Sequence, residues 1–144
     1  MRGREKFEMF KPLINPLIKF YALFPYCYRN RKMEFGNNVS FQLMVYFEAY
    51  GGVGIDDVLS FAEGSSLFSV NYSFKDMETP IKDQALIPLP IEIKNNLWNG
   101  AKATILGGVT IESRCVVETS AVINKSNVNV VVGGMPATIL KERK

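Results

Sequence analysis

The chain has 144 residues, a net charge of +3, two cysteines and no histidine. This length accommodates one domain with a continuous core, and two cysteines are too few for a disulfide framework, so a reducing cytoplasm is the expected compartment. We expect neither a metal site nor a nucleic-acid partner, because no Cys/His metal spacing, phosphate-binding loop or dinucleotide fingerprint is present and the basic residues are not interleaved with aromatics.

Residues 1–32 form the first predicted region. They hold eight Lys/Arg against two Asp/Glu, a net charge of +6 that leaves −3 for the remainder. Apolar residues between Phe7 and Tyr28 recur at i, i+3 and i+4, which predicts an amphipathic helix. Lysines and three prolines interrupt this stretch, which excludes a continuous membrane-spanning helix. The lysines and the lack of a small-residue cleavage site argue against a signal peptide. We favour a helical cap on the following domain; contact with an anionic membrane surface is the alternative.

Residues 33–144 form the second predicted region, and a six-residue rhythm dominates it. The downstream hexads begin at Ile93, Asn99, Ile105, Ile111, Val117 and Ile123, and upstream hexads begin at Phe35, Phe41, Ile55, Phe61 and Leu67. A fixed short period predicts a solenoid in which the first and fifth residues of each hexad face the core. Asn99 breaks the aliphatic pattern, and a buried amide at this position needs hydrogen-bond partners.

Residues 73–89 interrupt the rhythm. This stretch carries Pro80, Pro88 and mixed charge. We expect an inserted loop here, and loops of this length inside a compact repeat are more often functional than not.

Three segments resemble the hexapeptide-repeat acyltransferases, nearest to the O-acetyltransferases of sugars. Pro88–Ile111 resembles the wording P-I-x-I-G-x-N-V-W-I-G-x-x-A-T-I-L-x-G-V-x-I, and Val131–Lys141 resembles V-V-x-G-N-P-A-K-x-I-K. Thr79–Gln84 resembles the P-I-x-x-Q of the preceding loop. The resemblance implies an all-β solenoid, a left-handed parallel β-helix with a short C-terminal segment. It also implies a homotrimer that binds acyl-CoA between neighbouring subunits.

The chain departs from the family at the catalytic base. The family's D-H-x-H motif, whose histidine takes the acceptor's proton, aligns with Ser69-Val70-Asn71-Tyr72. Val70 cannot accept a proton, and losing such a base typically costs about 10²–10⁴ in rate. Candidate substitutes are Asp76, Glu78 and Glu48, although a solvated carboxylate is the simpler interpretation of each. Asn71 and Tyr72 are candidates to orient a substrate hydroxyl or simply to finish the coil.

The resemblance also implies a donor site for acetyl-CoA. The family binds the pantetheine arm along the coil edges, largely through main-chain groups. The matching positions are Ala101, Gly107, Gly108, Thr119 and Asn124, with Lys125, Thr138 and Lys141 near the nucleotide phosphates. Corner geometry is an equally good explanation of the glycines, and a solvated charge is the simpler reading of Lys141. Trp98 matches the family's tryptophan, for which we favour filling a coil corner over shielding the site.

Two functions remain open from the sequence. The resemblance implies acetyl transfer from acetyl-CoA to a sugar hydroxyl, as in polysaccharide modification, impaired or lost without the histidine. The alternative is a non-catalytic β-helix scaffold, a pseudoenzyme that serves as a partner subunit in a mixed trimer.

Overall fold

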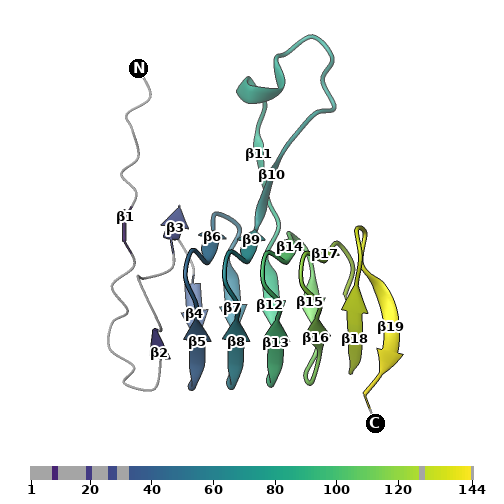
Figure 1. Cartoon of the computed structure of the whole chain (residues 1–144). Coiled ribbons are helices and arrows are strands. Elements are labelled where there is room, and N and C mark those ends of the chain that lie inside the picture. Colours follow the sequence, from purple (N-terminus) through teal and green to yellow (C-terminus); the bar gives the residue numbers. More distant parts are fainter. Residues whose placement is uncertain (1–7, 10–18, 21–25, 29–32, 127–128, 144) are drawn as a thin grey trace.

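The computed structural model describes residues 8–9, 19–20, 26–28, 33–126 and 129–143. Four successive coils of three short strands each make up most of this part of the chain (Figure 1). The strands of coils 1 and 2 are β4 (Met33–Phe35), β5 (Val39–Phe41), β6 (Tyr46–Glu48), β7 (Val53–Ile55), β8 (Leu59–Phe61) and β9 (Ser66–Phe68). Those of coils 3 and 4 are β12 (Ile91–Ile93), β13 (Leu97–Asn99), β14 (Thr104–Leu106), β15 (Thr110–Ile111), β16 (Val116–Val117) and β17 (Val122–Ile123).

Equivalent strands of successive coils pair in parallel and build three sheets. Sheet A contains β6, β9, β14 and β17, sheet B contains β5, β8, β13 and β16, and sheet C contains β4, β7, β12 and β15. The register advances by 20 residues between coils 1 and 2, as in the pair Val39 and Leu59, and by 18 between coils 3 and 4, as in Trp98 and Val116. The described coils are therefore a parallel β-helix. The hexads predicted a solenoid, and the family resemblance implied a solenoid of this kind.

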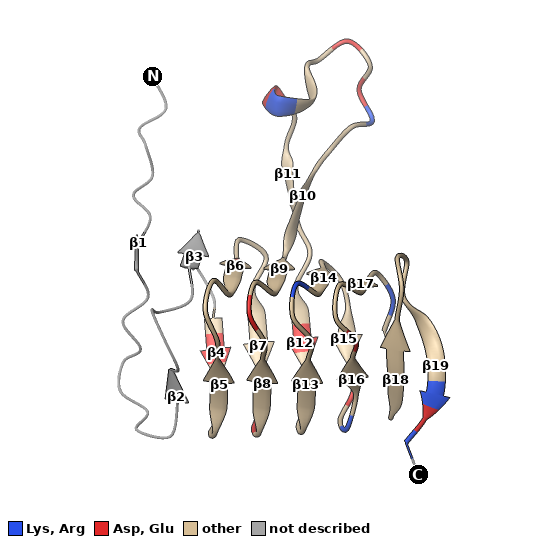
Figure 2. Cartoon of the chain, viewed as in Figure 1, with Lys and Arg blue, Asp and Glu red and all other residues tan. Residues whose placement is uncertain are grey.

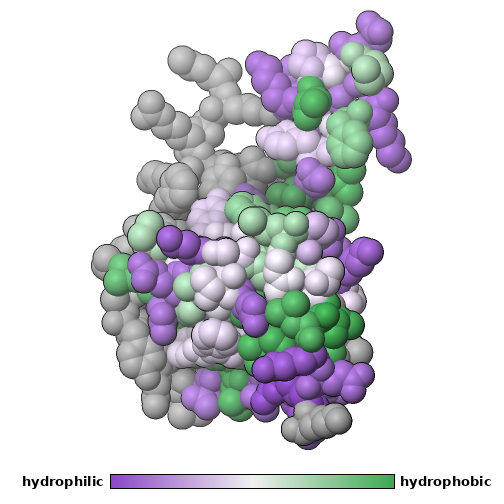
Figure 3. Space-filling model, turned by 45° about the vertical axis from the view of Figure 1, so that its right-hand side comes forward, coloured by the Kyte–Doolittle hydropathy of each residue, from purple (hydrophilic) through white to green (hydrophobic). Residues whose placement is uncertain are grey.

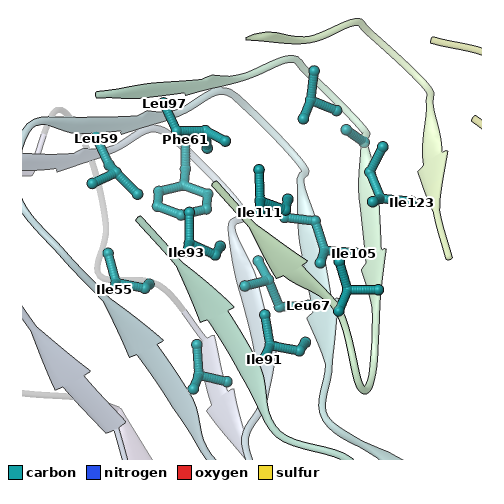
Figure 4. Close-up of a cluster of buried hydrophobic side chains, with 14 of the residues drawn as sticks. Ile55, Leu59, Phe61, Leu67, Ile91, Ile93, Leu97, Ile105, Ile111 and Ile123 are labelled. Carbon is teal, nitrogen blue, oxygen red and sulfur yellow. The ribbon is translucent and has the colours of Figure 1, made fainter. Parts of the chain in front are cut away.

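The first residues of the hexads stack into three inward ladders, one per sheet. The ladders are Phe35–Ile55–Ile93–Ile111, Phe41–Phe61–Asn99–Val117 and Phe47–Leu67–Ile105–Ile123. All of these side chains except the half-buried Phe35 are buried, and Figure 4 shows many of them converging inside the coils. Their burial confirms the predicted core. Each buried aliphatic side chain stabilises the fold by about 1.5–3 kcal/mol relative to an exposed one.

Asn99 lies inside this core, fully buried between Phe61 and Val117 of the adjacent coils. Neither its Oδ1 nor its Nδ2 has a hydrogen-bond partner among the described residues. The partners that the sequence argument required are thus absent from this part of the chain. The buried Ser65 hydroxyl also has no hydrogen-bond partner among the described residues.

Two corners of the coil are turned by residues in the left-handed backbone region. Between sheets C and B these are Asn38, Val58, Asn96 and Arg114, with φ of 56°, 62°, 61° and 64°. Between sheets B and A they are Met44, Gly64, Lys102 and Ser120, with φ of 59°, 67°, 57° and 60°. One left-handed residue per corner lets each hexad turn sharply and keeps the first residue of the next hexad pointing inward.

The predicted N-terminal helix is wrong for every residue of that segment that the structure describes. These residues form strands: β1 (Glu8–Met9), β2 (Lys19–Phe20) and β3 (Tyr26–Tyr28). β2 pairs in parallel with β5, and β3 with β6, while β1 pairs antiparallel with β3. Coil 1 presents open strand edges whose backbone groups need partners, and this pairing overrides the helical pattern. The rest of residues 1–32 lies outside the described part.

Four further strands and one short helix complete the described fold. β10 (Val70–Tyr72) and β11 (Leu86–Pro88) form an antiparallel hairpin, and the 3-10 helix η1 (Ile81–Asp83) lies in its loop. We call residues 70–88 the arm, because they project from the coils (Figure 1). At the other end, β18 (Val130–Gly133) continues sheet B in parallel and β19 (Thr138–Glu142) returns antiparallel along it.

Candidate functional site

Ala101 and Thr119 lie at the corner between sheets B and A on adjacent coils. Each immediately precedes a left-handed residue, Lys102 and Ser120 respectively. The Ser120 N–H donates to the Ala101 carbonyl at 2.9 Å, which stacks the two turns directly. Ala101 is half-buried and Thr119 is exposed, so both predicted donor contacts stand at the edge of sheet A.

Gly107, Gly108, Asn124 and Lys125 lie at the corner between sheets A and C, directly after β14 and β17. A Cβ at Gly107 would lie 2.5 Å from Leu89 Cβ, and Gly108 has φ +80°. The Gly108 N–H donates to the Pro90 carbonyl at 3.1 Å. Close packing at Gly107 and turn geometry at Gly108 are therefore sufficient to explain why glycine stands at these two positions.

These two corners border the same sheet. The first residues of the sheet A strands, Tyr46, Ser66, Thr104 and Val122, form one outward row that is uncharged. The last residues, Glu48, Phe68 and Leu106, form a second row that holds one carboxylate. The structure thus brings six of the eight predicted donor-site residues to the two edges of one face, on coils 3 and 4.

The other two predicted residues lie on β19. The Ala137 N–H donates to the Val122 carbonyl at 2.9 Å, which places the start of β19 beside sheet A. Thr138 follows it and pairs in register with Gly133. Lys141 is in register with Val131, farther along sheet B and away from the other candidates.

The arm rises from the corner between sheets A and C, and Ser69 ties its base together. The buried Ser69 hydroxyl donates to the Glu48 carbonyl at 2.9 Å and accepts the Gly51 N–H at 2.9 Å. The Ser69 carbonyl accepts the Leu89 N–H at 2.7 Å. Ser69 thus connects coils 1 and 2 with the return of the arm, a structural role that sequence reasoning missed because only alignment pointed to this position.

The positions aligned with the family's base lie on β10. Val70 is half-buried, Asn71 and Tyr72 are exposed, and the three pair with Pro88, Ile87 and Leu86 of β11. The Asn71 Oδ1 accepts the Tyr72 N–H at 2.9 Å, so this amide oxygen is used within the strand. Neither observation gives these residues a proton-accepting role.

Asp76 is committed to the loop of the arm. Its carboxylate accepts hydrogen bonds from the Thr79 hydroxyl and, at 2.9 Å, from the Glu78 N–H. The Thr79 bond is the main cause and the Glu78 bond the next of a pKa held below the ordinary aspartate value. Asp76 is therefore ionised at neutral pH and is a weaker proton acceptor than a free aspartate.

Trp98 does not fill a coil corner, contrary to the interpretation favoured from sequence. It is the middle residue of β13, points outward and is 46% exposed. It borders a shallow groove of about 350 Å³ over sheet B, together with Asn96, Val116 and Arg143. The alternation of the strand puts Leu97 and Asn99 inside and Trp98 outside.

The described residues contain neither a metal-binding cluster nor a membrane-spanning helix. No group of three or more Cys, Asp or Glu side chains there is arranged to hold a metal ion. Within the same ranges, no helix has both the length and the apolar character needed to cross a membrane.

The structure comparison defines the fold class. A maltose O-acetyltransferase from Clostridium difficile 630 superposes with a TM-score of 0.79 at 19% identity, over 90% of this chain and 72% of that one. A hexapeptide-repeat acetyltransferase from Vibrio cholerae, solved in complex with acetyl coenzyme A, superposes with a TM-score of 0.76 at 24% identity, over 83% and 65%. The fold is thus the left-handed parallel β-helix of these acetyltransferases.

The sequence comparison also finds an acetyltransferase among the relatives of the chain. The probable acetyltransferase Rv3034c of Mycobacterium tuberculosis is 29% identical over 114 residues, which is 78% of this chain and 38% of that protein. The chain therefore spans well under half the length of this relative. No protein-family model matches the present chain.

Proposed function

We propose that the chain is an acetyltransferase that moves an acetyl group from acetyl-CoA to a sugar hydroxyl. The observation that carries this proposal is the clustering of Ala101, Thr119, Gly107, Gly108, Asn124 and Lys125 along both edges of sheet A. The arm rises at one of these edges. The similar Vibrio cholerae structure contains acetyl coenzyme A, and the Clostridium difficile neighbour is a maltose O-acetyltransferase.

The chain's own residues would act mainly by shape and charge. Backbone groups at the two corners would hold the pantetheine arm against the uncharged outward row of sheet A. Lys125 would meet a phosphate as a compact point charge. Thr138 supplies only a hydroxyl at a position where the family usually has lysine or arginine. The acceptor hydroxyl would approach at the base of the arm.

Calorimetric titration with acetyl-CoA, with desulfo-CoA as comparison, tests the donor site. We expect micromolar binding at one site per subunit. Thr119→Trp should weaken it at least tenfold by obstructing the corner beside sheet A. Ser113→Trp, the equivalent corner position one hexad earlier, should leave it unchanged. Absence of binding at high ligand concentration would end the acetyltransferase proposal.

A non-catalytic scaffold, or a partner subunit in a mixed trimer, is the second candidate. Two observations favour it: Val70 stands where the family has its histidine, and Asp76 is occupied within the loop. Binding of acetyl-CoA without any transfer would support this candidate. Co-purification with a second β-helix chain that carries the intact D-H-x-H loop would support it further.

We further propose a homotrimer in the cytoplasm. The family resemblance supports the trimer, and the cysteine content supports the reducing compartment. Sedimentation equilibrium should give three times the 16.2 kDa mass of the chain. Contact of residues 1–32 with a membrane stays the less favoured alternative.

A further inference from the structure

Glu48 is the only carboxylate among the buried side chains of the described part of the chain. It is 7% exposed and ends β6 on coil 1. Acidic side chains are almost never buried without a specific reason. The candidate bases Asp76 and Glu78, in contrast, lie exposed in the loop of the arm.

The register places Glu48 at the base of the arm. Glu48 pairs with Phe68, and Phe68 pairs with Leu106, along the edge of sheet A. Strands are about 4.8 Å apart, so Glu48 lies about 10 Å from the coil that carries Gly107. The arm leaves the coils directly after Phe68, between Glu48 and the donor-site residues of coils 3 and 4.

Local hydrogen bonds fix the position of Glu48. Ser69, the residue directly before the arm, donates to the Glu48 carbonyl through both its N–H and its hydroxyl, each at 2.9 Å. The Tyr50 N–H donates to Glu48 Oε1 at 3.2 Å. The Ser69 bonds therefore hold the main chain of Glu48 at the base of the arm, and the Tyr50 bond helps to orient its carboxylate.

We propose that Glu48 is the general base of the reaction, taking the role that histidine has in the resembling family. This inference rests on the proposed function. The Glu48 carboxylate accepts the proton of the acceptor hydroxyl while the hydroxyl oxygen bonds to the acetyl carbonyl carbon. The carbon–sulfur bond then breaks, and the CoA thiolate leaves and takes up the proton. Acetyl-CoA approaches from coils 3 and 4 and the acceptor from coil 1.

Glu48→Gln separates this role from a structural one. Glutamine keeps an Oε1 to accept the Tyr50 N–H but cannot take a proton at neutral pH. With maltose or water as acceptor, we expect CoA release to fall at least 100-fold. The melting temperature and the calorimetric affinity for acetyl-CoA should stay unchanged. Glu112→Gln, an exposed carboxylate on coil 4, is the matched control and should keep the full rate.

The steady-state constants supply the second readout. Loss of the proton acceptor should lower kcat in Glu48→Gln, while the KM for acetyl-CoA stays unchanged. Equal rates for wild type and Glu48→Gln would overturn the inference. So would a wild-type protein that binds acetyl-CoA but releases CoA no faster than buffer. Failure of acetyl-CoA to bind at all would instead reject the proposed function.

Discussion

At the scale of single residues, Val58 occupies a backbone conformation that suits asparagine better. Its φ is +62°, and the residues at the same corner of the neighbouring coils are Asn38 and Asn96. A branched Cβ in the left-handed region is strained, whereas asparagine visits that region readily. The Val58 side chain is 51% exposed, so hydrophobic burial offsets little of this strain.

We therefore predict that Val58→Asn stabilises the protein by about 1 kcal/mol. Chemical denaturation, monitored by circular dichroism, measures the change. Asn96→Val makes the reverse exchange at the equivalent corner and should destabilise the protein by a similar amount. A loss of stability in Val58→Asn would show that Val58 is held by contacts rather than strained.

Asn99 gives a second prediction at this scale. Its buried amide has two unpartnered polar atoms in the described core, and each such group costs about 1–3 kcal/mol. Asn99→Val restores the aliphatic ladder between Phe61 and Val117 and should raise the free energy of unfolding by about 1–3 kcal/mol. Asn99→Asp, which buries a charge at the same position, should lower it. A less stable valine variant would indicate that the amide has a partner inside the coil.

At the scale of elements, the arm is ordered by hydrogen bonds while it exposes apolar surface. Gln84 Nε2 donates to the carbonyls of Asp76 at 2.7 Å and Thr79 at 2.8 Å. Phe74 and Met77 nevertheless remain 67% and 90% exposed. Figure 3 shows apolar and polar surface intermixed on the arm where it stands out from the coils.

Gln84→Ala should loosen the arm without affecting the coils. We expect amide hydrogen exchange in residues 74–84 to accelerate about tenfold, since each lost bond is worth about 0.5–1.5 kcal/mol, at unchanged melting temperature. Lys82→Ala, on the neighbouring η1, is the control. A lower melting temperature of the whole chain in Gln84→Ala would contradict an independent arm.

In the wild type, the stabilisation of the arm by the Asp76 carboxylate should be complete above the ordinary aspartate pKa. It should disappear as the pH falls through the lowered pKa of Asp76.

At the scale of the whole molecule, the three outer faces differ in charge. The outward row of sheet B within the four coils is uncharged and consists of Ser40, Ser60, Trp98 and Val116. The outward side of sheet A carries a single carboxylate there, the buried Glu48 at the end of β6. Sheet C instead carries Glu34 and Glu92, as the acidic patches on β4 and β12 in Figure 2 show. Sheets A and B are therefore the faces suited to contact a ligand or another subunit.

The sequence predicted most of the coil architecture but not the ends of the molecule. Hexad periodicity reports directly which residues face inward, so the ladders of Ile93, Ile105 and Ile111 were foreseeable. The N-terminal strands were not, because the apolar spacing of that segment predicted a helix, and pairing with the open edges of β5 and β6 overrides this local pattern. Propensity is a weak guide where such long-range pairing decides.

The candidate site was predictable in part for the same reason. Positions such as Ala101 and Thr119 follow from counting hexads, since the period fixes which residues share a corner. The role of Ser69 and the burial of Glu48 depend on how the arm leaves the coils, which no local pattern encodes. Trp98 was misplaced because the hexad match did not decide between corner and strand.

The direction of β19 has a consequence for self-association. A parallel solenoid ends in open strand edges onto which another copy could stack, and repeated stacking of this kind builds fibrils. β19 runs antiparallel to β18, is exposed along its whole length and ends in Lys141 and Glu142, which Arg143 follows. A further parallel coil cannot continue sheet B past a strand of the opposite direction, and the terminal charges discourage edge pairing. Growth into filaments from this end of the molecule would first require β19 to detach.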